Sequence, residues 1–250
     1  MLASLFASLV TSLFAGFVTS LARLAVLALV LATGPARADD LSDFNTAVEA
    51  AAAHNRVAIG YLRTGNTDLA SLEIDRLRAA WARVGERKRP AVFAGNALYV
   101  TVMTDIAMRL VTADMMLNSD RADAARQSLV GIRDGLYDLR KSAGVVVLAD
   151  CVRDANALMV YNDRALDWGK AGAAADIADK AARYSQTLTR CDGIADVAIR
   201  KEPEFRRLID GAQASLALIP KAVAERDSNL LHRVLIELRS FDNLLAFRFG

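Results

Sequence analysis

Apolar residues recur every three or four positions through most of this chain, which is the period of an amphipathic α-helix. Two clear examples are the series Leu129, Ile132, Leu136 and the series Phe205, Leu208, Ala212. Such series predict eight helices. Five cover about residues 41–64, 68–84, 91–117, 145–168 and 173–191, and three more follow residues 118–120, 203 and 227. We expect Pro220 to kink the seventh helix, because proline removes an amide donor from the helix.

The predicted fold is therefore all-α, with eight helices in four antiparallel hairpins. The composition agrees, since 4 prolines and 14 glycines among 250 residues favour long helices over strands and turns. The hairpins divide into two repeated four-helix units, residues 39–144 and 145–250. The pattern leaves open whether these units are two bundles or one continuous helical stack.

The two predicted units resemble each other when one is shifted onto the other. Asn55 then lies over Asn162, Tyr61 lies over Trp168, and the turn glycines that follow coincide, which suggests an internal duplication. Both asparagines fall beside an apolar stripe, so we expect them to be buried, and a buried amide needs hydrogen-bond partners. A structural hydrogen bond to a neighbouring helix is the favoured role for each, and ligand binding is the alternative.

One hairpin resembles a known repeat family over a short stretch. Residues 57–70 carry the relevant positions, which are Val57, Ala58, Tyr61, Gly65, Asp68 and Ala70. They are similar to the first helix, the turn and the start of the second helix of a tetratricopeptide repeat. The resemblance implies a stacked helical scaffold that binds a protein or a peptide. It does not extend to a family for the whole chain.

Residues 1–38 have the features of a secretory signal peptide. They contain no acidic residue, and an apolar run from Leu24 to Ala32 is followed by Gly34, Pro35 and an Ala-x-Ala site that ends at Ala38. We predict cleavage after Ala38 and export to the periplasm. The apolar stretch at residues 2–22 leaves an uncleaved membrane anchor as the alternative, and only then would we expect a membrane contact.

Cleavage also changes the charge of the chain. The full sequence has 31 basic and 29 acidic residues, and loss of Arg23 and Arg37 makes the mature chain formally neutral. A neutral chain without a clustered positive field is not typical of a nucleic-acid-binding protein. We therefore expect no nucleic acid among its partners.

The only two cysteines, Cys151 and Cys191, are predicted to form a disulfide, as is usual for an exported protein. Each stands about twenty residues from the turn near residue 170 between the fifth and sixth helices, at 1.5 Å per residue. In an antiparallel hairpin the two residues would therefore lie level. Two free thiols buried as small apolar groups are the alternative.

The sequence offers little that is typical of catalysis or of a cofactor site. It has no Gly-x-Ser-x-Gly, no Gly-x-Gly-x-x-Gly and no phosphate-binding loop. With only His54 and His232, it lacks the paired histidines of a helical metal site. A non-covalent haem is conceivable, with His232 and one of Met103, Met108, Met115 and Met116 as its ligands. Methionines on an apolar helix, however, usually fill a core. Glu73 stands beside Arg76, and we expect a solvated ion pair there.

These observations favour an exported helical binding or scaffold protein without catalytic activity or a cofactor. Its partner would be a protein or a peptide. A helical bundle that carries a cofactor or a metal, and an unrecognised periplasmic enzyme, remain the alternatives. The sequence names no catalytic residue, and the disulfide pair together with the buried amides Asn55 and Asn162 are its only candidate sites.

Overall fold

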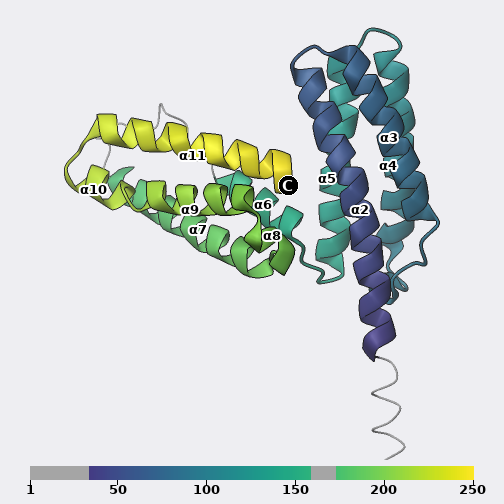
Figure 1. Cartoon of the computed structure of the whole chain (residues 1–250), viewed down its shortest axis with the longest axis horizontal. Coiled ribbons are helices and arrows are strands. Elements are labelled where there is room, and N and C mark those ends of the chain that lie inside the picture. The colour runs from purple at the N-terminus through teal and green to yellow at the C-terminus, as the bar shows by residue number, and fades with distance from the viewer. Residues whose placement is uncertain (1–33, 159–172) are drawn as a thin grey trace, which may run out of the picture.

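A computed structural model describes residues 34–158 and 173–250 and shows an α-helical protein (Figure 1). The first part contains α2 (Gly34–Arg63), α3 (Thr67–Gly85), a 3₁₀ helix η1 (Ala91–Phe93), α4 (Ala97–Leu117) and α5 (Ala122–Ser142). The second contains α6 (Leu148–Leu158), α7 (Ala173–Ile194), α8 (Val197–Lys201), α9 (Pro203–Leu216), α10 (Ile219–Ala224) and α11 (Ser228–Phe249). These two ranges contain no strand, so the predicted all-α class is confirmed.

The helices of the first part close into a ring around one core. α2 packs on α3, α3 on α4, α4 on α5, and α5 back on α2. The predicted stripe of α5 is buried inside this ring, where Leu129, Ile132 and Leu136 belong to the same apolar cluster as Phe44 and Ile106. A ring that closes in this way is a four-helix bundle.

The second part repeats this order of contacts. α6 packs on α7, α7 on α9, α9 on α11, and α11 back on α6, around a separate apolar cluster that includes Tyr184, Phe205 and Leu208. The shared order is what a duplication would produce. Superposition of the two halves stays a prediction, because Asn162 and Trp168 lie outside the described residues.

Two predicted helices have different limits in the structure. The helix expected over 91–117 is interrupted, because Gly95 adopts a φ of +75° and the side chain of Asn96 then caps α4 by accepting from the Leu98 N–H. The seventh helix ends at Leu216 and α10 begins at Ile219, so Pro220 lies in a first turn. An N–H in the first turn of a helix has no partner within the helix, so proline is tolerated there. The predicted kink in a continuous helix is therefore wrong, and Pro220 lies at the start of a new helix.

The predicted disulfide is present. Cys151 on α6 and Cys191 on α7 are both buried, and their Cα atoms lie 5.4 Å apart, within the range that a disulfide requires. Neither cysteine is free. The bond joins the two helices that the sequence places in one hairpin.

The predicted signal peptide falls mostly outside the described residues, which begin at Gly34 within α2. Residues 1–33 are not described, and the predicted cleavage site after Ala38 lies in the first turns of α2. Cleavage and the alternative of an anchor both stay predictions. Among helices in the described ranges, none combines the length and the apolar character needed to cross a membrane.

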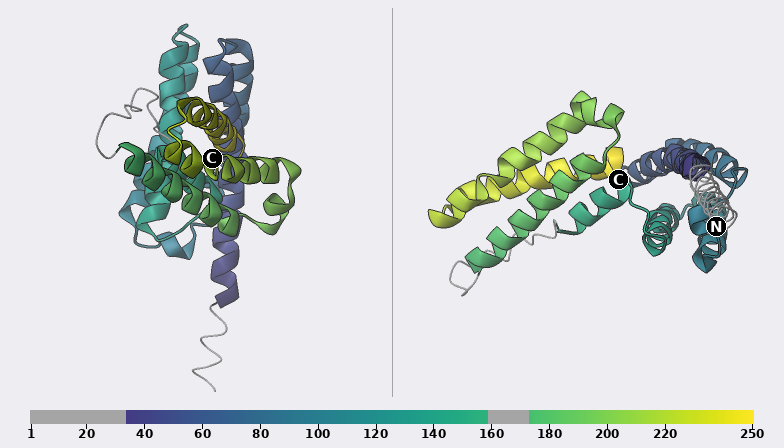
Figure 2. Two further views of the ribbon diagram at one scale, coloured as in Figure 1. Left: turned by 90° about the vertical axis from the view of Figure 1, so that its left-hand side faces the viewer. Right: turned by 90° about the horizontal axis from the view of Figure 1, so that it is seen from below.

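The two rings meet through α5 and α6 and through α2 and the end of α11. Figures 1 and 2 show the last turn of α11 beside the middle of α2, and the helices of one ring run across the direction of the other. A bidentate pair between Arg140 on α5 and Asp150 on α6 lies at this junction, at 2.7 and 2.5 Å. Both side chains are at most 9% exposed.

Candidate functional site

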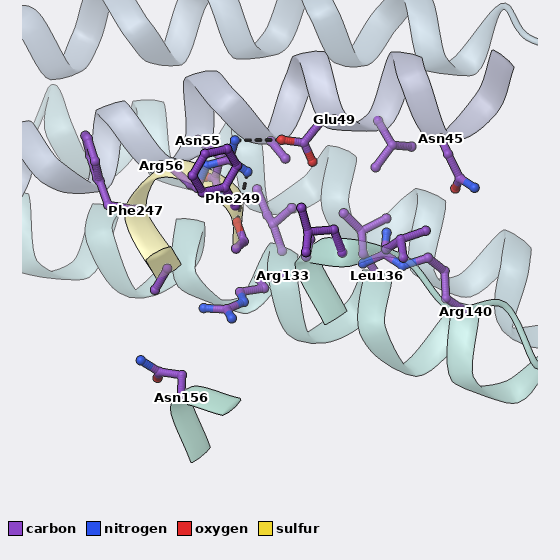
Figure 3. A pocket seen from close by; sticks show the side chains of 18 of the residues that line it. Asn45, Glu49, Asn55, Arg56, Arg133, Leu136, Arg140, Asn156, Phe247 and Phe249 are labelled. Atoms are coloured by element: carbon purple, nitrogen blue, oxygen red, sulfur yellow. Dashed lines mark hydrogen bonds and ion pairs between the residues drawn. The ribbon is translucent and has the colours of Figure 1, made fainter. Parts of the chain in front are cut away.

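A pocket of about 790 Å³ lies at the junction of the two rings (Figure 3). One long part of its wall is a face of α2 from Leu41 to Arg63, and α5, which packs beside α2, contributes residues from Val130 to Arg140. The ends are closed by residues 146–149, by Asn156 and the chain near 194–199, and by α11 from Asn243 to Gly250. Its volume is within the usual range for small-ligand sites.

Polar contacts between α5 and α6 hold one side of this pocket. Besides the Arg140–Asp150 pair, the Tyr137 hydroxyl donates to Asp154 at 3.0 Å, and Arg153 donates to Asp134 at 2.9 Å. The Arg153 guanidinium also lies 3.9 Å from the centre of the Tyr137 ring, which adds a cation–π contact. These contacts fix the angle at which the second ring leaves the first.

Arg56 holds the other side by attaching α2 to the end of α11. Its guanidinium donates to the carbonyl oxygens of Gly250 at 2.8 Å and Arg248 at 3.2 Å, and to Glu49 at 2.6 Å. α2 and α11 are also close one turn further along α2, where a Cβ added to Gly60 would lie only 3.3 Å from the Phe247 ring. Arg56 is therefore satisfied by the protein itself and has a structural role.

Asn55 lies in the wall of the pocket and is 5% exposed. Its Nδ2 donates to the Leu129 carbonyl oxygen on α5 at 3.2 Å, so the helix-to-helix hydrogen bond expected from the sequence is found at this residue. The Oδ1 atom of the same amide is buried and accepts no hydrogen bond. Because a carbonyl can only accept, the bond to Leu129 fixes which end of the amide is unpartnered.

Arg133 is the residue that the sequence did not single out. It lies on α5 in the pocket wall, and its Nε and Nη2 atoms are buried without a hydrogen-bond partner. Burial, together with the positive charges of Arg153 and Arg56, lowers the pKa of Arg133 below its usual value, although Asp134 and Asp150 act in the opposite direction. A buried guanidinium with unused N–H donors would be stabilised by an anion that accepts hydrogen bonds from it.

A buried carboxyl group lies behind the pocket on the side of the second ring. Asp242 on α11 is 4% exposed and accepts from Asn156 Nδ2 at 2.5 Å and from the Tyr184 hydroxyl at 3.2 Å. Burial raises the pKa of Asp242 to about 6, against the effects of these two hydrogen bonds and of the charge on Arg133. Asn156 connects this carboxyl group to the pocket, because it also lines the wall.

The second predicted amide, Asn162, lies outside the described residues.

Glu73, expected in a solvated pair, is instead 7% exposed, and its carboxylate contacts His54 Nδ1 at 2.7 Å and Arg76 at 2.5 Å. Burial raises the pKa of Glu73, but the hydrogen bonds from His54 and Arg76 outweigh it and lower the value overall. The expected ion pair with Arg76 is therefore present, but Glu73 is buried because α3 packs this position against α2, which the charge pattern alone does not reveal.

The structure does not bring the conceivable haem ligands together. His232 is exposed on α11 in the second ring, whereas the methionines considered with it lie on α4 in the first ring, where Met103 and Met116 pack against the core and Met108 and Met115 are exposed. Within the described residues, no group of His, Cys, Asp and Glu side chains is arranged to hold a metal ion.

The junction pocket is thus the site that the geometry defines: a concave surface between two helical bundles, apolar over most of its area, with unpartnered amide and guanidinium groups. Comparison of the chain with protein-family models, with curated proteins and with solved structures finds no match.

Proposed function

We propose that this chain is an exported helical binding protein without catalytic activity, and that it holds a peptide or a segment of a protein in the pocket between its two units. The observation that carries the proposal is the set of buried polar atoms in the pocket wall that have no partner in the folded chain, Asn55 Oδ1 and Arg133 Nε and Nη2. An unpaired buried polar group costs free energy, and a bound ligand would supply the missing partner.

The remaining walls support a binding site more than a catalytic one. Arg56 and Arg140 are already engaged in hydrogen bonds that join the two units, and Asn156 is engaged with Asp242. These groups keep the shape of the pocket constant, and a preformed shape reduces the ordering cost of binding. Apolar side chains from α2, α5 and α11, such as Ile59, Val130 and Phe247, line the space that a ligand would fill.

Export is part of the proposal. The disulfide between Cys151 and Cys191 supports it, because thiols of cytosolic proteins are normally kept reduced. The signal-like segment at residues 1–38 supports it independently. N-terminal sequencing of protein recovered from the periplasm should begin at Asp39. A chain that begins at Met1 and stays with the membrane after a carbonate wash would instead establish the anchor.

The binding proposal is tested by selecting ligands from a library of short random peptides and measuring their affinities by fluorescence anisotropy. Val146 lines the pocket and is 62% exposed, so a Val146→Trp variant should fold normally while its indole blocks the space. We expect the selected peptides to bind this variant at least about tenfold more weakly, a loss of about 1.4 kcal/mol.

Val100→Trp is the matched control, because Val100 is 61% exposed on α4 and lies outside the pocket. It should bind the selected peptides as the wild type does. The proposal is wrong if no peptide is enriched over a blank surface, or if Val146→Trp and wild type bind the enriched peptides equally well.

A further inference from the structure

Arg133 is placed where a cation is unfavourable for the ligand-free protein. Its guanidinium is largely removed from water, and its Nε and Nη2 atoms donate to nothing. Burial and the charges of Arg153 and Arg56 together outweigh the favourable charges of Asp134 and Asp150, and the pKa of Arg133 is lowered overall. Replacing a buried charge by an apolar side chain of similar size is often neutral or stabilising. A residue that costs stability in the free protein, and that faces a cavity, is best explained by a ligand that pairs with it.

The α2 wall of the pocket, in contrast, has hydrogen-bond acceptors that lack a donor. Asn45 Oδ1 and Asn55 Oδ1 are both buried acceptors without a donor, and Figure 3 shows both side chains leaving α2 on the side of α5. They are ten residues apart, which corresponds to roughly 15 Å along a helix. An extended peptide rises about 3.3 Å per residue, so about five residues would span the two amides.

A peptide satisfies these groups better than a fatty chain does. It carries an N–H donor at every residue except proline, so its backbone can donate to both amides while its apolar side chains contact the walls. An acyl chain has no donors along its length and would leave Asn45 and Asn55 unpartnered in an apolar contact. Only the anionic group that Arg133 requires is common to the two ligand classes.

Resting on the proposed function, we infer that the pocket recognises an extended peptide segment bearing a carboxylate, with Arg133 donating to that carboxylate and with Asn45 and Asn55 accepting backbone N–H groups. The carboxylate belongs either to an acidic side chain or to the end of the peptide. Both offer two coplanar oxygens to the planar guanidinium fork.

Three libraries of N-acetylated hexapeptides, with aspartate and glutamate left out of the random positions, separate these sources. In the first, one fixed glutamate stands in an amide-ended peptide. In the second, glutamine replaces that glutamate. In the third, the glutamine peptides end in a free carboxylate. The measured quantity is the fraction of each library that immobilised protein retains. We expect the first or the third library to be retained at least about tenfold more than the second, and the library with the higher retention identifies the source.

Variants of Arg133 test its role. Arg133→Met should reduce retention of the carboxylate-bearing library to the level of the glutamine library, and Arg133→Lys should restore part of it, since lysine keeps the charge without the fork. The matched control is Arg121→Met, because Arg121 is exposed and lies outside the pocket. The melting temperature of ligand-free Arg133→Met should equal or exceed that of wild type, which separates lost binding from lost folding.

Several results would overturn the inference. If all three libraries are retained equally and Val146→Trp still blocks binding, the proposed function stands, but the inference that the ligand needs a carboxylate is wrong. Retention of laurate through Arg133 without retention of peptides would replace the peptide by an acyl anion. A clear fall in melting temperature for Arg133→Met, reproduced by Asp242→Asn, would show that Arg133 serves the buried carboxyl group of Asp242. If nothing is retained and Val146→Trp changes nothing, the proposed function itself fails.

Discussion

The protonation of Asp242 should make stability depend on pH in a way that one substitution removes. Burial raises the pKa of this carboxyl group from 3.8 to about 6, so between about pH 4 and pH 6 the folded state holds a proton that the unfolded state has released. Unfolding then releases a proton, and the free energy of unfolding falls as the pH rises through this window. The stabilisation from this group is complete below the unfolded pKa and is lost above the folded one.

The magnitude follows from the shift. A change of one pKa unit corresponds to 1.36 kcal/mol, and a shift of roughly two units therefore corresponds to about 3 kcal/mol between pH 4 and pH 7. Asp242→Asn keeps the shape of the side chain and has no charge to bury. Its single amide oxygen replaces the two carboxylate oxygens that accept from Asn156 and Tyr184, so one of these hydrogen bonds is lost, at a cost that does not change with pH in this range. The variant should gain stability relative to wild type as the pH rises, by about 3 kcal/mol across the window.

The assay is urea unfolding of both proteins at several pH values from 4 to 7, followed by tryptophan fluorescence. Taking the difference between variant and wild type cancels the titration of the other carboxylates. Asp123→Asn is the control for the substitution itself, because the Asp123 side chain is 96% exposed. A difference between Asp242→Asn and wild type that stays constant with pH, or falls as the pH rises, would refute the reasoning.

Three further results are expected from urea unfolding. Reducing the disulfide should cost about 4 kcal/mol, since it closes a loop of 40 residues, and an unchanged midpoint would contradict this. Asp150→Ala should cost about 3–5 kcal/mol by leaving Arg140 buried and unpaired. Changing Arg140 and Asp150 together to leucine should recover much of this loss. If it does not, the unpaired charge is not the cause. Gly211→Ala should lose about 1–3 kcal/mol because its Cβ would lie 2.6 Å from the Phe241 ring. Gly135→Ala, whose nearest contact is 3.5 Å, should instead be neutral or stabilising, and equal effects at both glycines would refute the clash.

The parts of the fold that the sequence predicted well are those set by local periodicity. The α5 stripe from Leu129 to Leu139 and the α9 stripe from Phe205 to Leu216 are buried as expected, because one face of a helix in a bundle must leave water. The disulfide was predictable for a similar reason, since helix rise alone makes Cys151 and Cys191 level across a hairpin.

The errors arose where a single residue changes the backbone. Gly95 adopts a positive φ that separates η1 from α4, although the apolar pattern continues across it. Leu216 ends α9 before Pro220, so the proline begins a new helix. An apolar stripe predicts which face of a helix is buried, but it does not predict whether the helix continues without a break.

The candidate site was predictable only in part, and the reason is its position between the two units. Asn55 could be identified because it interrupts the apolar face of its own helix, and that face packs on α5 within one ring. Arg133 gave no such signal, since an arginine next to the α5 stripe is ordinarily solvated. The charged groups that act on it include Asp150 on α6 and Asp242 on α11. Both belong to the second ring, and the periodicity of α5 says nothing about which residues of another unit lie near it.

This position has a consequence for how the site works. α2 and α5 supply the long parts of the wall, but the pocket is closed by residues 194–199 and by the end of α11, so neither ring forms the site alone. The angle between the rings is held by charged contacts such as Arg140–Asp150 and Arg153–Asp134 and not by a shared apolar core, since the two cores are separate clusters. The affinity of the pocket is therefore coupled to the integrity of the junction, and substitutions at its ion pairs should weaken binding even though none of their atoms needs to touch the ligand.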